Sequence, residues 1–195
     1  HGLGKAPELV IIKRWGATSD GWAVDFTQAG NKIFELHNSN AGAADAAWGE
    51  HTNTVVNLIG STGARNTNGD NHVMYSFTSI PGFSHVGTYK GTGDAGIYGR
   101  FVQLDFRPAF ILVKADQGGQ YWVIMDSTFN DGRSYTSKRI FPNDGGAGDS
   151  SAEFEFHANG FKFYNGAENI DGTNFYYYAC ADQPGEYSNA NLINI

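Results

Sequence analysis

The stretch Phe106-Arg107-Pro108-Ala109-Phe110-Ile111-Leu112-Val113-Lys114 places a proline before an apolar run that ends on a lysine. The chain opens on the same pattern, in Lys5-Ala6-Pro7-Glu8-Leu9-Val10-Ile11-Ile12-Lys13. The two prolines are about 100 positions apart, and so are the two closing lysines, which is the signature of an internal duplication. Apolar runs entered through proline predict buried β-strands at residues 9–13 and 109–115.

Three further landmarks recur in the same order in both halves of the chain. They are Gly21–Asp25 and Tyr121–Asp126, Asn68–Phe77 and Asp171–Cys180, and Pro81-Gly82 and Pro184-Gly185. Four ordered landmarks are hard to obtain by chance. The sequence therefore predicts two tandem repeats of about 100 residues, with a first β repeat at 1–90 and a second at 91–195.

The composition favours an all-β protein. Among 195 residues there are 26 glycines, and aromatic residues make up 14% of the chain. Glycine- and asparagine-rich turns separate short runs of β-branched and aromatic residues, and no window carries a helical pattern. Further strands are expected at 22–26, 32–37, 54–59, 72–79, 84–89, 101–105, 121–126, 135–141, 152–157, 160–165 and 174–181. This spacing is typical of β-sandwich or jelly-roll-like units, which here could also form one compact body.

Charge and cysteine content exclude several classes of function. The net charge is −7 and no basic run occurs, which argues against binding to a nucleic-acid backbone. A single cysteine, Cys180, leaves no intrachain disulfide framework. No stretch approaches the roughly 20 apolar residues of a membrane span, so we expect no membrane insertion. No motif calls for a cofactor or a metal.

Aromatic residues in or near loops are the candidate binding residues. An exposed ring can stack on a sugar, and five side chains have this placement: Trp15, Trp48, Tyr89, Tyr98 and Tyr164. They are candidates for a carbohydrate-binding site. The aromatic residues that recur at matched repeat positions, such as Trp22 and Trp122, are interpreted as core instead.

A histidine at position 1 suggests one enzymatic alternative. Some β-sandwich copper oxygenases that cleave polysaccharides bind their metal through an N-terminal histidine and a second histidine. Here the second ligand could come from His37, His51, His72, His85 or His157. Copper binding by a chain that natively begins at His1 would favour this alternative.

Several runs together resemble a known family. They are His1–Pro7, Tyr75–Phe77, Gly82–Ser84, Gly87–Tyr89, Gly91–Gly93, Phe106–Phe110, Asn159–Lys162 and Tyr187–Ala190. They are similar to a domain of unknown function that is common in tail-fibre-like and other structural proteins of tailed bacteriophages, especially marine ones. It often follows a laminin-G/concanavalin-like jelly roll. In that family the run equivalent to His1-Gly2-Leu3-Gly4 is internal, which implies that His1 is a truncation point. The resemblance brings no catalytic residues.

The sequence thus predicts a non-enzymatic structural module of a virion, in a tail fibre or another virion-surface protein, with a structural role, a host-adhesion role or both. The expected partners are sister subunits or other virion proteins, with host-surface glycans as a further candidate, and the expected location is the virion or the extracellular space. Three alternatives stay open: a lectin-like carbohydrate-binding module, a cellular surface filament or adhesin subunit, and a secreted polysaccharide-active enzyme that uses His1.

Overall fold

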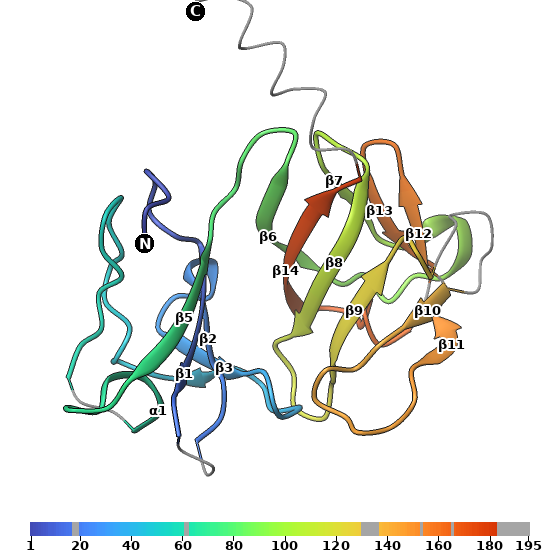
Figure 1. The fold of residues 1–195 in the computed structure, drawn as a ribbon. Coiled ribbons are helices and arrows are strands. Elements are labelled where there is room, and N and C mark those ends of the chain that lie inside the picture. Colours follow the sequence, from blue (N-terminus) through green and yellow to red (C-terminus); the bar gives the residue numbers. More distant parts are fainter. Residues whose placement is uncertain (17–19, 61–62, 130–136, 153, 165, 183–195) are drawn as a thin grey trace, which may run out of the picture.

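The computed structural model describes residues 1–16, 20–60, 63–129, 137–152, 154–164 and 166–182. The chain is all-β, and every pairing between its strands is antiparallel. The N-terminal part forms a five-stranded sheet in the order β4-β3-β2-β1-β5. Its strands are β1 (Leu9–Arg14), β2 (Ala23–Phe26), β3 (Lys32–Glu35), β4 (Ala43–Ala44) and β5 (His72–Phe77). We call it the first sheet; it occupies the left of Figure 1.

The C-terminal part contains a four-stranded sheet in the order β6-β14-β8-β9, which we call the second sheet. Its strands are β6 (Ser84–Lys90), β8 (Pro108–Ala115), β9 (Trp122–Asp126) and β14 (Asn174–Ala181). An outer sheet has the order β12-β13-β7, and a two-stranded ribbon joins β10 and β11. These strands are β7 (Phe101–Gln103), β10 (Ser137–Arg139), β11 (Asp149–Ala152), β12 (Phe154–His157) and β13 (Gly160–Phe163).

Most of the predicted strands are present, with ends that differ by a few residues. The strand predicted at 54–59 is wrong, because this segment holds only an isolated bridge between Leu58 and Trp48. Thr52 closes a local turn there: its backbone N–H donates to the Val55 carbonyl (2.9 Å), and its hydroxyl accepts from the Val55 N–H (3.0 Å). A short polar side chain that bonds nearby backbone in this way competes with strand pairing.

The helices are short: α1 (Gly63–Asn66) and the 3₁₀ turns η1 (Thr27–Ala29) and η2 (Gly96–Tyr98). Some sequence predictions fall outside the described residues. These are positions 135, 136, 153 and 165 of the predicted strands and the tail 183–195, which includes the run Tyr187–Ala190.

The two main sheets share an arrangement of strands. In the first, β1 lies between β2 and β5; in the second, β8 lies between β9 and β14. The registers also correspond. Ile11 lies opposite Val24 and Tyr75, and Leu112 lies opposite Ile124 and Tyr178. Beyond β2 and β9, the bridge from Ile124 to Ile140 places β10 where β3 lies in the first sheet.

The strand β6 belongs to the second sheet. It pairs with β14 from Asn174 opposite Lys90 to Cys180 opposite Ser84. Figure 1 shows it beside β14 on the C-terminal side of the molecule. The boundary predicted between residues 90 and 91 stays a prediction. The strand β6 ends just before this boundary and belongs to the second sheet.

The first and second sheets pack against each other through one hydrophobic core. Alternate side chains of each strand point to opposite faces of its sheet, so one face of each sheet supplies this core. Its buried members are Leu9, Ile11, Val24, Phe26, Phe34, Val86, Leu112, Trp122 and Tyr176. We call this group the shared core. The two halves of the chain therefore form one sandwich-like body.

Four aromatic rings form the centre of the shared core. The ring centroid of Phe26 lies 6.1 Å from that of Trp122 and 5.6 Å from that of Tyr176. Phe34 meets the same two rings at 6.4 and 5.3 Å. The Trp122 indole N–H donates to the Glu35 carbonyl (2.9 Å), which satisfies its polar atom within the core. Such rings combine large apolar burial with about 0.5–1.5 kcal/mol per well-oriented pair.

Each sheet has a second core on its other face. In the second sheet, residues such as Ile111, Val113 and Met125 pack with a phenylalanine cluster on the outer sheet. In the first sheet, Val10, Ile12 and Ala23 pack against Trp48, with Ile33, Val56 and Leu58 at the margin. This smaller core is covered by the loop segment 45–58 instead of a complete sheet (Figure 1).

A lysine near the end of each central strand fastens the hairpin that follows. The Lys114 ammonium donates to the Gln120 carbonyl (2.8 Å), and the Lys13 ammonium donates to the Asp20 carbonyl.

Lys114 is fully buried, and this burial lowers its pKa to about 8, although the Asp116 carboxylate favours the charged form. Asp116 in turn accepts hydrogen bonds from Lys32 and from the Gly42 N–H (3.0 Å), which ties the second sheet to the first.

We expect the burial of Lys114 to make stability depend on pH. Its pKa of about 8 in the folded chain lies below the ordinary lysine value of 10.5, so the unfolded chain binds more protons between these two values. The contribution of Lys114 to the free energy of unfolding therefore rises with pH across that window. Between pH 7.5 and 9.5, the wild type should gain about 1–2 kcal/mol relative to Lys114→Met, as measured by urea unfolding.

The exposed Lys5 provides the control. Lys5→Met should keep the pH dependence of the wild type. Equal pH dependence in the wild type and in Lys114→Met would contradict the account of Lys114.

Candidate functional site

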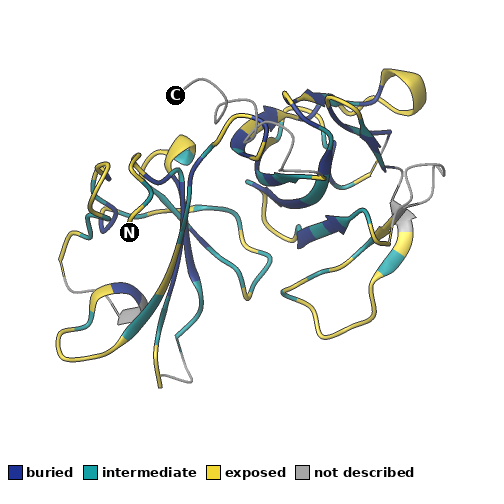
Figure 2. Ribbon diagram, turned by 45° about the horizontal axis from the view of Figure 1, so that its top comes forward, coloured by how far each residue is buried: buried dark blue, intermediate teal, exposed yellow. Residues whose placement is uncertain are grey.

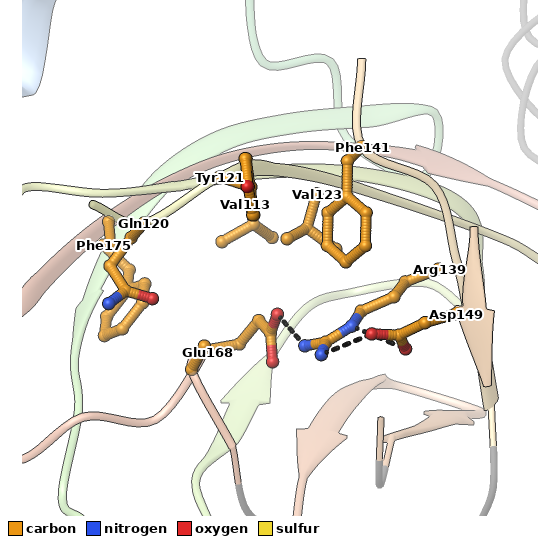
Figure 3. A pocket seen from close by; sticks show the side chains of 11 residues that line it. Val113, Gln120, Tyr121, Val123, Arg139, Phe141, Asp149, Glu168 and Phe175 are labelled. Atoms are coloured by element: carbon orange, nitrogen blue, oxygen red, sulfur yellow. Dashed lines mark hydrogen bonds and ion pairs between the residues drawn. The ribbon is translucent and has the colours of Figure 1, made fainter. Parts of the chain in front are cut away.

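A cluster of three charged side chains, of which Glu168 is buried, centres on Arg139. This residue lies on β10, and its guanidinium makes two hydrogen bonds to the Asp149 carboxylate on β11, at 3.0 and 2.9 Å. Its third nitrogen donates to the Glu168 carboxylate at 2.6 Å. Glu168 comes from the loop between β13 and β14 (Figure 3). The three side chains therefore join two segments that are far apart in the sequence.

A cavity of about 170 Å³ lies above this cluster. Figure 3 shows apolar side chains on one side of it and the three charged groups on the other. Val113, Val123, Phe141 and Phe175 line the apolar side. The Arg139 guanidinium also lies over the Phe141 ring, 5.1 Å from its centroid.

The electrostatics of the site follow from burial. Glu168 is only 2% exposed, and desolvation raises the pKa of its carboxyl, while Arg139 acts in the opposite direction. For Arg139, desolvation lowers the pKa, but hydrogen bonds and attraction to Asp149 and Glu168 outweigh it and the pKa is raised. All three guanidinium nitrogens already bond carboxylates of the chain itself. The arrangement therefore suits a clamp between segments better than recognition of an external anion.

The structure separates the five predicted carbohydrate-binding aromatics into two groups. Trp15 and Tyr98 are 72% and 76% exposed, so their rings could stack on a sugar. Trp15 follows β1 of the first sheet, whereas Tyr98 lies in η2, where the Ile97 carbonyl accepts a hydrogen bond from Lys162 of the outer sheet. They do not form one site. Carbohydrate binding at either residue stays a prediction.

The other three predicted aromatics are buried, so none offers an open ring face. Trp48 is covered by the Arg65 guanidinium, 5.3 Å from its ring centroid. Tyr89 stacks on Phe175 at 4.8 Å, and its hydroxyl donates to the Glu168 carbonyl at 2.8 Å. Tyr164 donates its hydroxyl to the Glu155 carboxylate, and Lys162 lies over its ring.

The ring of His1 makes two contacts with the backbone. Its ring Nε2 lies 3.1 Å from the Thr52 carbonyl, and its Nδ1 accepts from the Leu3 N–H. Within the described ranges, no three His, Cys, Asp or Glu side chains are arranged to hold a metal ion. The same part of the chain contains no helix long and apolar enough to cross a membrane.

Sequence reasoning missed the charged cluster. Arg139 and Glu168 are distant in the sequence, and Asp149 sits in a glycine-rich run that predicts only a turn. It also missed Asp25, which is only 3% exposed. A signal for Asp25 did exist. Aligning the Trp22 and Trp122 segments places Asp25 against Met125, a polar residue against an apolar one.

The fold is that of an all-β, sandwich-like domain. In its charged cluster, the guanidinium of Arg139 is paired with the carboxylates of Asp149 and Glu168. The chain belongs to the family described as Domain of unknown function (DUF7483), whose model matches residues 1–184. No curated protein and no solved structure gave a match to this chain.

The clamp makes a prediction for Arg139→Met. Removing the guanidinium leaves Glu168 buried without its partner, which typically costs about 3–5 kcal/mol of stability. The loss should be larger at pH 8 than at pH 5, because the pKa of Glu168 is already raised and rises further without Arg139, so acid neutralises the buried carboxylate. Urea unfolding at the two pH values measures this difference.

The double variant Arg139→Met/Glu168→Gln is the control. It removes both charges, so it should recover much of the stability at pH 8 and lose the added pH dependence. If the single variant is as stable as the wild type at pH 8, the clamp contributes little.

Proposed function

We propose that this chain is a non-enzymatic structural module of a virion, in a tail fibre or another surface protein of a tailed phage, where it assembles with sister chains. Its structural role can be combined with adhesion to a host surface. The observation that carries the proposal is the open edge of β5. The sequence resemblance to phage structural proteins supports the same assignment.

The strand β5 is an edge of the first sheet, and among the described residues its strand partner is β1. Its six residues, HVMYSF, contain no lysine, acid or proline. Met74 and Tyr75 are 40% and 50% exposed. Figure 2 shows β5 in the colours of intermediate and exposed residues. Natural proteins usually protect long edge strands with charges, prolines or bulges, and an unprotected edge is a template for pairing with another chain.

The direction of the free backbone groups follows from the ladder. The Trp15 N–H donates to the Asn71 carbonyl (2.7 Å), so residues 71, 73, 75 and 77 carry the bonds to β1. In an antiparallel pair these bonds alternate along the strand. The N–H and C=O groups of His72, Met74 and Ser76 therefore point to the open side.

The second sheet shows how such an edge can be completed. There β14 has the position that β5 has in the first sheet, and β6 pairs along it from Asn174 to Cys180. Tyr178, opposite Leu112, is half-buried, whereas Tyr75, opposite Ile11, is exposed. A strand from a sister chain that added to β5 would reproduce the pairing of β6 with β14.

We also infer that the two sheets arose by tandem duplication. The shared strand order, the corresponding registers and the paired lysines support this. In such a duplicated module, β6 covers one sheet edge and the corresponding edge at β5 is open. The two ends of the module therefore differ, so copies could add to one another in a single orientation, as in a fibre or a stacked assembly.

Sedimentation velocity over a range of concentrations tests the assembly. The wild type should form oligomers reversibly. Met74→Lys places a charge on the edge, and Ser76→Pro removes an outward N–H that β1 does not use; each should weaken self-association about tenfold or more. Ile97→Lys is the matched control, because Ile97 is 74% exposed and lies in η2, and it should assemble like the wild type.

A wild type that stays monomeric at millimolar concentration would refute pairing with sister chains through β5. Equal weakening by Ile97→Lys would mean that surface charge, and not the edge, controls assembly.

A further inference from the structure

A second cavity lies beside the first sheet, and it is independent of the β5 edge. Its volume is about 340 Å³, which is in the range of small-molecule sites and far above the roughly 30 Å³ of one water. It is lined by the N-terminal segment, the end of β2 and the following turn, and the loop from Trp48 to His51. Its lining residues include Glu8, Asp25, Trp48, Glu50 and His51.

A buried pair of polar side chains forms one wall. The Nε2 atom of His51 lies 3.1 Å from Oδ2 of Asp25, and the two side chains are 1% and 4% exposed. The Nδ1 atom of His51 accepts from the Asn57 N–H at 3.2 Å. This contact assigns the proton to Nε2, which donates to Asp25. Both ring nitrogens are thereby engaged, so the imidazole holds Asp25 in place and is not free to take a proton from a substrate.

The position of Asp25 is unusual for this fold. Asp25 lies opposite Val10 in the first sheet, and Met125 lies opposite Ile111 in the second. Met125 is fully buried within a hydrophobic core. The same ladder position therefore holds an apolar side chain in one sheet and a carboxylate in the other. Such departures from a consistent apolar core are expected where a protein binds something.

Asp25 and Trp48 both line the cavity, and each carries a buried polar atom without a hydrogen-bond partner. Oδ1 of Asp25 is buried and has no hydrogen-bond partner, and neither has the indole nitrogen of Trp48. One is an acceptor and the other is a donor. A hydroxyl group can donate to the carboxylate and accept from the indole, whereas an ammonium group would leave the indole N–H unsatisfied. Unpaired buried groups are costly, so a ligand that satisfies both is favoured.

From these observations we propose that this cavity is a binding site for a neutral polyhydroxylated ligand, such as a single hexose unit of a glycan. Asp25 accepts a ligand hydroxyl, His51 fixes the carboxylate, and Trp48 offers its indole N–H. The site differs from the exposed aromatic platforms predicted at Trp15 and Tyr98. It does not rest on the assembly proposed above, because β5 does not line it.

Saturation-transfer NMR tests the site with four probes: D-glucose, D-galactose, D-mannose and N-acetyl-D-glucosamine. At least one should bind the wild type at millimolar concentration. Asp25→Asn keeps an acceptor for His51 but presents an N–H₂ group to the ligand, so affinity should fall about tenfold or more. The matched control is Asp94→Asn, the same change at an exposed residue outside the cavity, which should bind within about twofold of the wild type.

A second variant separates binding from folding. Asp25→Met/His51→Leu copies the apolar position of the second sheet, so it should unfold at the same temperature as the wild type or higher and should lose the hexose signal. Three outcomes would overturn the proposal: no hexose binds the wild type, a hexose binds Asp25→Asn unchanged, or n-butylamine binds where the hexoses do not. Each leaves the β5 proposal standing, because the sedimentation experiment uses no sugar.

Discussion

The packing of Phe26 and Phe34 against Trp122 and Tyr176 is the interaction on which the rest of the structure depends. These rings come from both sheets, so neither sheet can bury this face without the other. Once the two faces meet, the opposite face of each sheet must find a different cover. The outer sheet supplies it on one side, and the loop around Trp48 supplies it on the other.

One sheet face is covered by the outer sheet and the other by the loop around Trp48, and this difference explains where polar side chains are buried. The core under the outer sheet is built from apolar and aromatic side chains, and the compensated clamp around Arg139 lies beside it. The smaller core around Trp48 instead admits Asp25 and His51 beside a cavity. The two sides of the structure therefore differ in the polar groups that they bury.

The strands were largely predictable, because alternating and continuous apolar runs report directly on which backbone is extended and buried. The segment 54–59 was not, because the side-chain hydrogen bonds of Thr52 favour a turn over a ladder. The candidate sites were hardly predictable. Arg139 and Glu168, or Asp25 and His51, meet only after the chain has folded, and a loop aromatic such as Tyr89 looks the same in sequence whether it is exposed or enclosed.

The sequence by itself determined the all-β class, the two Pro-led central strands and the lysine near the end of each, since these follow from local composition and a period of about 100 residues. Only the tertiary structure decided that the two halves share a core, that β6 completes the second sheet and that β5 is the last strand of the first sheet in the described part of the chain. The physical reason is that strand partners and side-chain enclosure are set by contacts between residues far apart in the chain, which no local pattern specifies.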